Sequence, residues 1–89
     1  MRCAYHPDYY VPLPATHPFP MAKYPRLYER LRAYGWLEER EVIEPVEAAL
    51  DDLRLVHTDD YLTQLSNGTL DASAIRKIGV PWSPAWWRR

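Results

Sequence analysis

The chain has 89 residues, of which 47% are hydrophobic, with 11 basic side chains, 12 acidic side chains and one cysteine. The mixed, nearly neutral charge gives no electrostatic case for binding nucleic acid, which needs a clustered basic surface, and one cysteine excludes an internal disulfide. No apolar run reaches the roughly 20 residues that cross a bilayer, and no signal-peptide stretch follows Met1. We therefore expect one small cytoplasmic domain over residues 1–89, with no nucleic-acid or membrane partner.

The first half of the chain predicts a strand, a stiff loop and a helix. Residues 2–5 form a short, partly apolar run stopped by Pro7, which predicts a strand, and five prolines between 7 and 20 predict an irregular loop. A helix is expected from Lys23 or Tyr24 to a cap at Gly35, with Pro25 in its first turn. Its buried face is predicted from the i, i+3, i+4, i+7 spacing of Tyr24, Leu27, Tyr28, Leu31 and Tyr34.

The second half alternates short extended and helical patterns. A strand is predicted at 42–43, a helical turn at 46–50, another extended piece at 53–56, and helices that begin after Thr58 and Asp71. Gly68 and Gly79 are expected to end the two helices. Their predicted buried positions are Tyr61, Leu62, Leu65, Ala72, Ile75 and Ile78. The alternation of strands and helices predicts an α/β fold with parallel pairing.

The last eight residues are unusually aromatic. Trp82, Trp86 and Trp87 lie where chain ends are commonly polar and frayed. Large aromatic side chains bury about 150–250 Å² each when they are covered. The pattern therefore predicts an interior segment that a continuation of the chain or a partner covers.

The histidines, the cysteine and the carboxylates are the candidate reactive groups of the chain. Cys3, His6, His17 and His57 lack the close paired spacing of structural zinc sites, so no metal site is predicted within this chain. On a strand, Cys3 and His6 point to opposite faces, which also argues against a nucleophile pair. His57 with two following aspartates allows an acid–base set, but the same residues suit a strand end, a cap and a first helical turn. We favour the structural interpretation.

Three segments in a fixed order carry a family resemblance. They are His-Pro-Phe-Pro-Met-Ala-Lys-Tyr at 17–24, Val-His-Thr-Asp-Asp-Tyr-Leu at 56–62, and Ile-Gly-Val-Pro-Trp-Ser-Pro at 78–84. Together they resemble the N-terminal segment of histone deacetylases, closest to the class IV type. The resemblance implies the N-terminal part of an arginase/deacetylase-type open parallel sheet with flanking helices, incomplete in this chain.

The resemblance also implies an activity for the complete family member. That activity is zinc-dependent hydrolysis of acetyl-lysine or related acetylated amines, with the zinc ligands and a catalytic histidine pair later in the chain. No catalytic residue and no cofactor is therefore expected within residues 1–89, and whether this chain alone is an enzyme stays open. The residues implied at the rim or wall of the acyl channel are His17, Pro18, Phe19, Lys23 and Trp82. Simple loop packing is the competing interpretation for each of them.

Two functional hypotheses follow from this resemblance. In the first, the chain is a truncated deacetylase segment whose partner is the missing C-terminal part of the domain. In the alternative, it is a stand-alone interaction module that pairs with a second chain through its Trp-rich tail.

Overall fold

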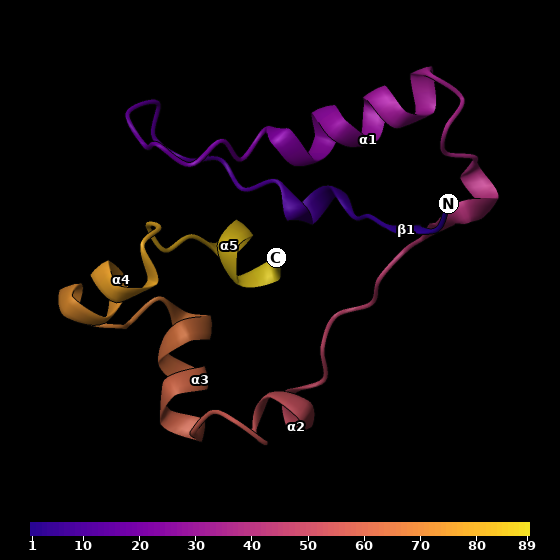
Figure 1. Ribbon diagram of the computed structural model, residues 1–89. Coiled ribbons are helices and arrows are strands. Elements are labelled where there is room, and N and C mark those ends of the chain that lie inside the picture. The colour runs from indigo at the N-terminus through magenta and orange to yellow at the C-terminus, as the bar shows by residue number, and fades with distance from the viewer. The chain divides into compact units, whose positions relative to one another are not determined.

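The computed structural model describes residues 1–89 and contains two compact units (Figure 1). The first unit comprises Met1–Val46 with Arg89, and the second comprises Glu47–Arg88. The molecule is rich in helix and has one two-stranded parallel sheet. The predicted parallel pairing is confirmed, and the pair is consistent with an α/β class. Two strands of two residues do not establish the open sheet that the resemblance implies.

The sheet lies in the first unit and joins distant parts of the chain. Strand β1 (Cys3–Ala4) runs parallel to β2 (Val42–Ile43), with Cys3 opposite Val42 and Ala4 opposite Ile43. The Tyr5 amide donates to the Ile43 carbonyl at 3.1 Å and extends the pairing by one bond. Parallel strands need a crossover connection, and the loop and helix between β1 and β2 provide it within the same unit.

The proline-rich stretch after β1 is irregular, as predicted, apart from its first turn. A 3₁₀ helix, η1 (Pro7–Tyr9), is capped by His6, whose Nδ1 accepts the Asp8 amide at 3.0 Å. The chain then runs out to a tip and returns into α1 (Figure 1). Val11 and Met21 are buried on this path and form part of the small core.

Helix α1 (Lys23–Ala33) has the predicted bounds. Pro25 lies in the first turn, where its missing N–H costs no bond, and Gly35 follows the C-cap with φ +71°. Tyr28 is half-buried and stacks on Tyr5 at 4.0 Å between ring centroids. The predicted buried face is wrong at two positions, since Leu27 is 60% and Tyr34 is 58% exposed. The rest of the unit covers only the side of α1 that carries Tyr24, Tyr28 and Leu31.

A short capped turn leads into β2. The 3₁₀ helix η2 (Glu39–Glu41) has a capping box, in which the Glu41 carboxylate accepts the Glu38 amide at 2.9 Å. The same carboxylate accepts a bond from the Met1 ammonium at 2.6 Å. The Glu38 bond, and then the ammonium, lower the pKa of Glu41 below its ordinary value.

The second unit is helical throughout. It contains α2 (Leu50–Leu53), α3 (Asp59–Asn67), α4 (Ala72–Ile78) and α5 (Pro84–Arg88). The predicted caps of α3 and α4 are confirmed: Thr58 accepts the Tyr61 amide, and Asp71 accepts the Ala74 amide. Both helices end at a glycine in the left-handed region, Gly68 or Gly79.

Two sequence predictions around α2 are wrong. The helical turn begins at Leu50 rather than at 46, and residues 53–56 are not extended. Leu53 ends α2, and the Leu55 and Val56 amides donate back to Asp52 and Leu53 at 3.2 Å each. No strand lies beside this stretch to receive its backbone groups, so they close a turn instead. The consequence is that His57 follows a turn, not a strand.

The core of the second unit is built on α3. The buried side chains are Leu62, Leu65 and Leu70, and α3 packs against α5. Of the predicted face of α4, Ile75 and Ile78 are half-buried but Ala72 is exposed. None of the helices combines the length and apolar content needed to cross a bilayer.

Candidate functional site

Four of the five residues expected from the sequence lie together at the loop-to-helix junction of the first unit. Short bonds shape this junction: the His17 amide donates to the Pro14 carbonyl at 2.8 Å, and His17 Nδ1 accepts the Phe19 amide at 3.2 Å. The Met21 amide donates to the Phe19 carbonyl at 2.9 Å, and the Met21 side chain is buried. Pro18 and Phe19 stay exposed between these anchors. The exposed residues of the junction therefore project from a backbone that local hydrogen bonds hold in place.

Lys23, at the start of α1, places its ammonium against two aromatic rings. Its Nζ lies 4.8 Å from the Phe19 ring centroid and 5.2 Å from the Tyr24 ring centroid. A cation in this position is attracted by the electron-rich faces of the rings. Lys23 remains exposed. The Arg89 guanidinium lies 5.2 Å from the same Tyr24 ring and donates to its hydroxyl at 3.2 Å, so two positive charges are held beside this aromatic surface.

Trp82, the fifth expected residue, belongs to the second unit and has packing partners there. Its Nε1 donates to the Leu65 carbonyl at the end of α3. Its ring covers Gly68, where an added Cβ would lie 2.7 Å from the indole. Trp86 and Trp87 are also half-buried. These contacts give Trp82 a structural role inside its own unit.

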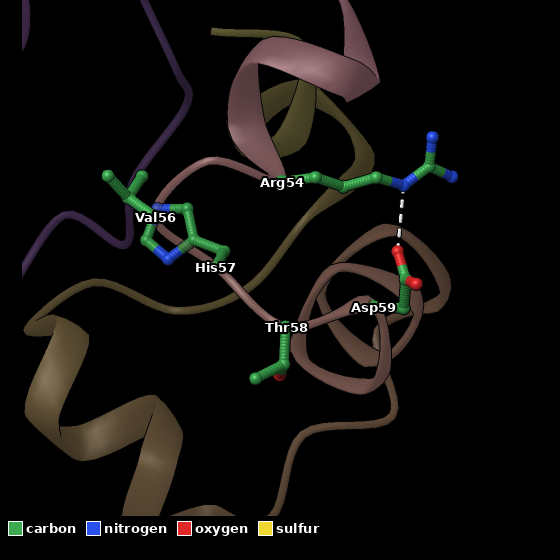
Figure 2. Close-up of a pocket in the computed structure, with 5 residues that line it drawn as sticks. All are labelled: Arg54, Val56, His57, Thr58 and Asp59. Atoms are coloured by element: carbon green, nitrogen blue, oxygen red, sulfur yellow. Dashed lines mark hydrogen bonds and ion pairs between the residues drawn. The ribbon is translucent and has the colours of Figure 1, made fainter.

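The second unit has an open hollow between α2 and α3 (Figure 2). Its lining residues are Arg54, Val56, His57, Thr58 and Asp59. Figure 2 shows the Arg54 side chain reaching over to Asp59, where Nε donates to the carboxylate at 2.7 Å. Arg54 also donates to Asp51 at 2.7 Å, so one guanidinium joins α2 to the first turn of α3.

The electrostatics of this hollow favour a structural interpretation. The bonds to Asp59 and then Asp51 raise the pKa of Arg54 above its ordinary value. Asp59 is already held by Arg54, while His57 lies 5.3 Å from the Tyr61 ring between centroids. An acid–base pair needs a hydrogen bond of about 2.6–3.2 Å or a bridging water, and no bond joins His57 to Asp59 or Asp60 in this structure.

A metal centre needs several ligand side chains around one point. No three histidine, cysteine, aspartate or glutamate side chains lie close enough together to hold an ion. His6 has carboxylates on both sides, with Asp8 at 3.6 Å and Glu44 at 3.7 Å, but its Nδ1 already accepts a backbone bond. These side chains therefore do not form a zinc site in this structure.

Sequence reasoning missed two features of these sites. Tyr24 was assigned to the buried face of α1, yet its ring also contacts the Lys23 ammonium. The hollow at 54–59 was not expected because residues 53–56 were predicted to be extended. An arginine placed between aspartates three residues before it and five residues after it was the available signal for a closed turn.

Comparisons with known proteins give a partial similarity. No model of a protein family matches the chain. The chain is 43% identical over 79 residues, 89% of its own length, to an uncharacterized protein of Picosynechococcus sp., of which it covers 26%. It is 35% identical over 68 residues, 76% of its own length, to Histone deacetylase 2 of Arabidopsis thaliana, of which it covers 18%. The chain thus spans about a quarter or less of these relatives, and over that stretch it is similar to part of a histone deacetylase.

Proposed function

We propose that residues 1–89 are the N-terminal segment of a zinc-dependent deacetylase that hydrolyses acetyl-lysine or a related acetyl amide. The observation that carries this proposal is the 35% identity over 68 residues to a histone deacetylase. In this proposal the segment supplies rim and wall of the acyl channel. The metal ligands and the proton-transferring histidines are expected in parts of the protein outside these residues.

The junction at 17–23 has the chemistry of such a wall. Phe19 presents an exposed ring that can pack along the aliphatic stem of an acylated lysine. Its backbone amide and carbonyl are bonded to His17 and Met21, so little backbone entropy is lost when a substrate is ordered against it.

Lys23 supplies a positive charge to this wall. Release of acetate leaves a carboxylate, and an ammonium held beside two rings offers that anion a positive partner. Lysine acts here as a point charge because it lacks the planar fork with which arginine binds both carboxylate oxygens. We therefore expect Lys23 to affect binding and release of the acid product more than recognition of the amide.

A segment exchange tests the proposal. The matching 68-residue stretch of Histone deacetylase 2 is replaced by the corresponding residues of this chain, and acetate release from an acetyl-lysine peptide is measured. We expect the chimera to keep deacetylase activity, whereas a version lacking the stretch is inactive. A chimera that unfolds, or that folds cooperatively without activity, contradicts the proposal.

Lys23 is tested in the same chimera with Lys23→Met. Loss of a charge-assisted bond worth about 1.5–3 kcal/mol lowers activity by about 10–100-fold. Lys77→Met is the matched control, because Lys77 is the chain's other lysine and is exposed on α4. Equal effects of the two substitutions contradict the role of Lys23. The family assignment is tested separately, by the activity of the chimera without either substitution.

A further inference from the structure

One side of α1 is exposed and both basic and apolar. Arg26, Leu27, Arg30 and Tyr34 all lie on it, and at 100° per residue they span an arc of about 100°. Arg30 donates to the Tyr34 hydroxyl at 3.3 Å, which confirms that these side chains are neighbours. We call these four residues the basic face.

One acid borders the basic face without an ion pair to it. Glu29 is the only acidic residue in α1, and it is exposed. At 100° per residue it lies about 60° from Arg26, and no ion pair joins it to Arg26 or Arg30, so the face keeps two arginines beside one carboxylate. Trp36, just beyond the helix, is 65% exposed and its ring lies 5.2 Å from that of Tyr34, which enlarges the apolar part of this surface.

The stretch 47–60 in the second unit has the opposite character. It carries five carboxylates and one arginine, and that arginine is engaged by Asp51 and Asp59. Leu55 is 82% and Val56 is 78% exposed in the turn between α2 and α3, and Val56 lines the open hollow (Figure 2). We call residues 47–60 the acidic segment.

We propose that the chain binds a second copy of itself, with the basic face of one copy seated on the acidic segment of the next. Each surface offers what the other lacks: two exposed guanidinium groups beside Leu27 and Tyr34, and exposed carboxylates beside Leu55 and Val56. The charges steer and align the contact, and the apolar side chains leave water when it forms. This proposal does not rest on the deacetylase function.

The contact is heterologous, because different surfaces of the two copies meet. A bound pair keeps one basic face and one acidic segment available, so association continues to a closed ring or an open chain. The weight-average mass therefore rises with concentration above the 10.5 kDa of one chain. Sedimentation equilibrium of the full chain measures this rise directly.

Salt separates this contact from non-specific apolar aggregation. Raising NaCl from about 50 mM to about 500 mM shortens the Debye length, so we expect the mass to fall toward that of a single chain. Aggregation through apolar surface alone is not weakened by salt. A mass that stays at one chain at low salt, or that rises with salt, overturns the proposal.

Charge reversal gives the sharpest test. Arg26 and Asp52 are exposed, and neither side chain has a hydrogen-bond or ion-pair partner. Arg26→Glu removes the net positive charge of the basic face, and Asp52→Lys lowers the negative charge of the acidic segment. Each variant alone is therefore expected to associate at least about tenfold more weakly. In an equimolar mixture, the unchanged basic face of the Asp52→Lys copy can bind the unchanged acidic segment of the Arg26→Glu copy. The two reversed charges also attract each other, so association returns.

Matched substitutions outside the two surfaces are the controls. Arg76→Glu on α4 and Glu39→Lys in η2 make the same charge changes at exposed positions, and we expect wild-type association from both. Leu55→Ser tests the apolar part at a side chain whose loss leaves the fold intact. Far-UV circular dichroism checks that every variant is folded. Association that survives Arg26→Glu, Asp52→Lys and Leu55→Ser, or a mixture that does not restore it, overturns the proposal.

Discussion

Substituting Gly68 with alanine tests how the Trp-rich tail is held. Gly68 has φ +71°, and a Cβ there meets three atoms of the Trp82 ring at 2.7, 2.8 and 2.9 Å. The left-handed backbone costs alanine about 1–2 kcal/mol, and forcing an extra carbon against a packed ring costs about 1–3 kcal/mol more. The indole cannot simply move away, because its Nε1 donates to the Leu65 carbonyl. We expect Gly68→Ala to destabilise the protein by about 2–5 kcal/mol.

Gly79→Ala is the matched control for Gly68→Ala. Gly79 has φ +85° at the same position relative to α4, but its added Cβ meets nothing within 4 Å. It therefore carries the backbone strain without the clash, and the difference between the two variants isolates the contact with Trp82. Thermal unfolding followed by tryptophan fluorescence measures that difference, at about 4–8 °C for each kcal/mol in a chain of this size.

Equal destabilisation by the two glycine substitutions refutes this reasoning. A second refutation comes from the Trp82→Leu background, in which the smaller side chain removes the clash. There, Gly68→Ala is expected to cost no more than the backbone strain. If its cost is unchanged, Trp82 does not pack on Gly68 and the account of the tail is wrong.

The remaining predictions concern the cap of α3, a tyrosine pair and the small core. Thr58→Ala removes the acceptor of the Tyr61 amide and lowers the free energy of unfolding by about 1 kcal/mol, whereas Thr58→Ser keeps it; urea unfolding compares the two. Burial, and then the charges of Glu29 and Tyr28, raise the pKa of Tyr5 above 10.0. The contribution of the Tyr5 phenol to stability is therefore present below pH 10.0 and is lost as the pH rises through the raised pKa. Tyr5→Phe is expected to reduce the alkaline loss of stability, and an unchanged pH profile argues against this. Leu70→Ala, at a buried site, lowers the free energy of unfolding by about 2–5 kcal/mol, whereas Leu55→Ala, at an exposed site, changes it by no more than about 0.5 kcal/mol. Thermal unfolding separates the two variants, and similar losses contradict the assigned core.

The candidate site was chosen by family resemblance rather than by residue patterns. The resemblance grouped His17, Phe19 and Lys23, and in the structure these three residues lie at one loop-to-helix junction. Trp82 was grouped with them by resemblance, but it lies in the other unit and packs on Gly68. Its partners are distant in sequence from the junction, and spacing carries no information about such contacts.

The local features of the chain were determined by its sequence. Thr58 and Asp71 cap helices because their side chains reach an amide three residues ahead, and glycines end those helices because a Cβ disfavours positive φ. These interactions close within one turn, so neighbouring residues suffice to predict them.

Burial and pairing were decided by the tertiary structure. Periodicity identified an apolar stripe on α1, but only the packing of Tyr5 on Tyr28 shows which part of that stripe is covered, and it leaves Leu27 and Tyr34 exposed. Likewise, residues 53–56 form a turn because no neighbouring strand accepts their backbone groups and because Arg54 binds carboxylates on both sides. Helix caps depend on atoms a few bonds apart, whereas burial depends on which distant segments pack against a residue.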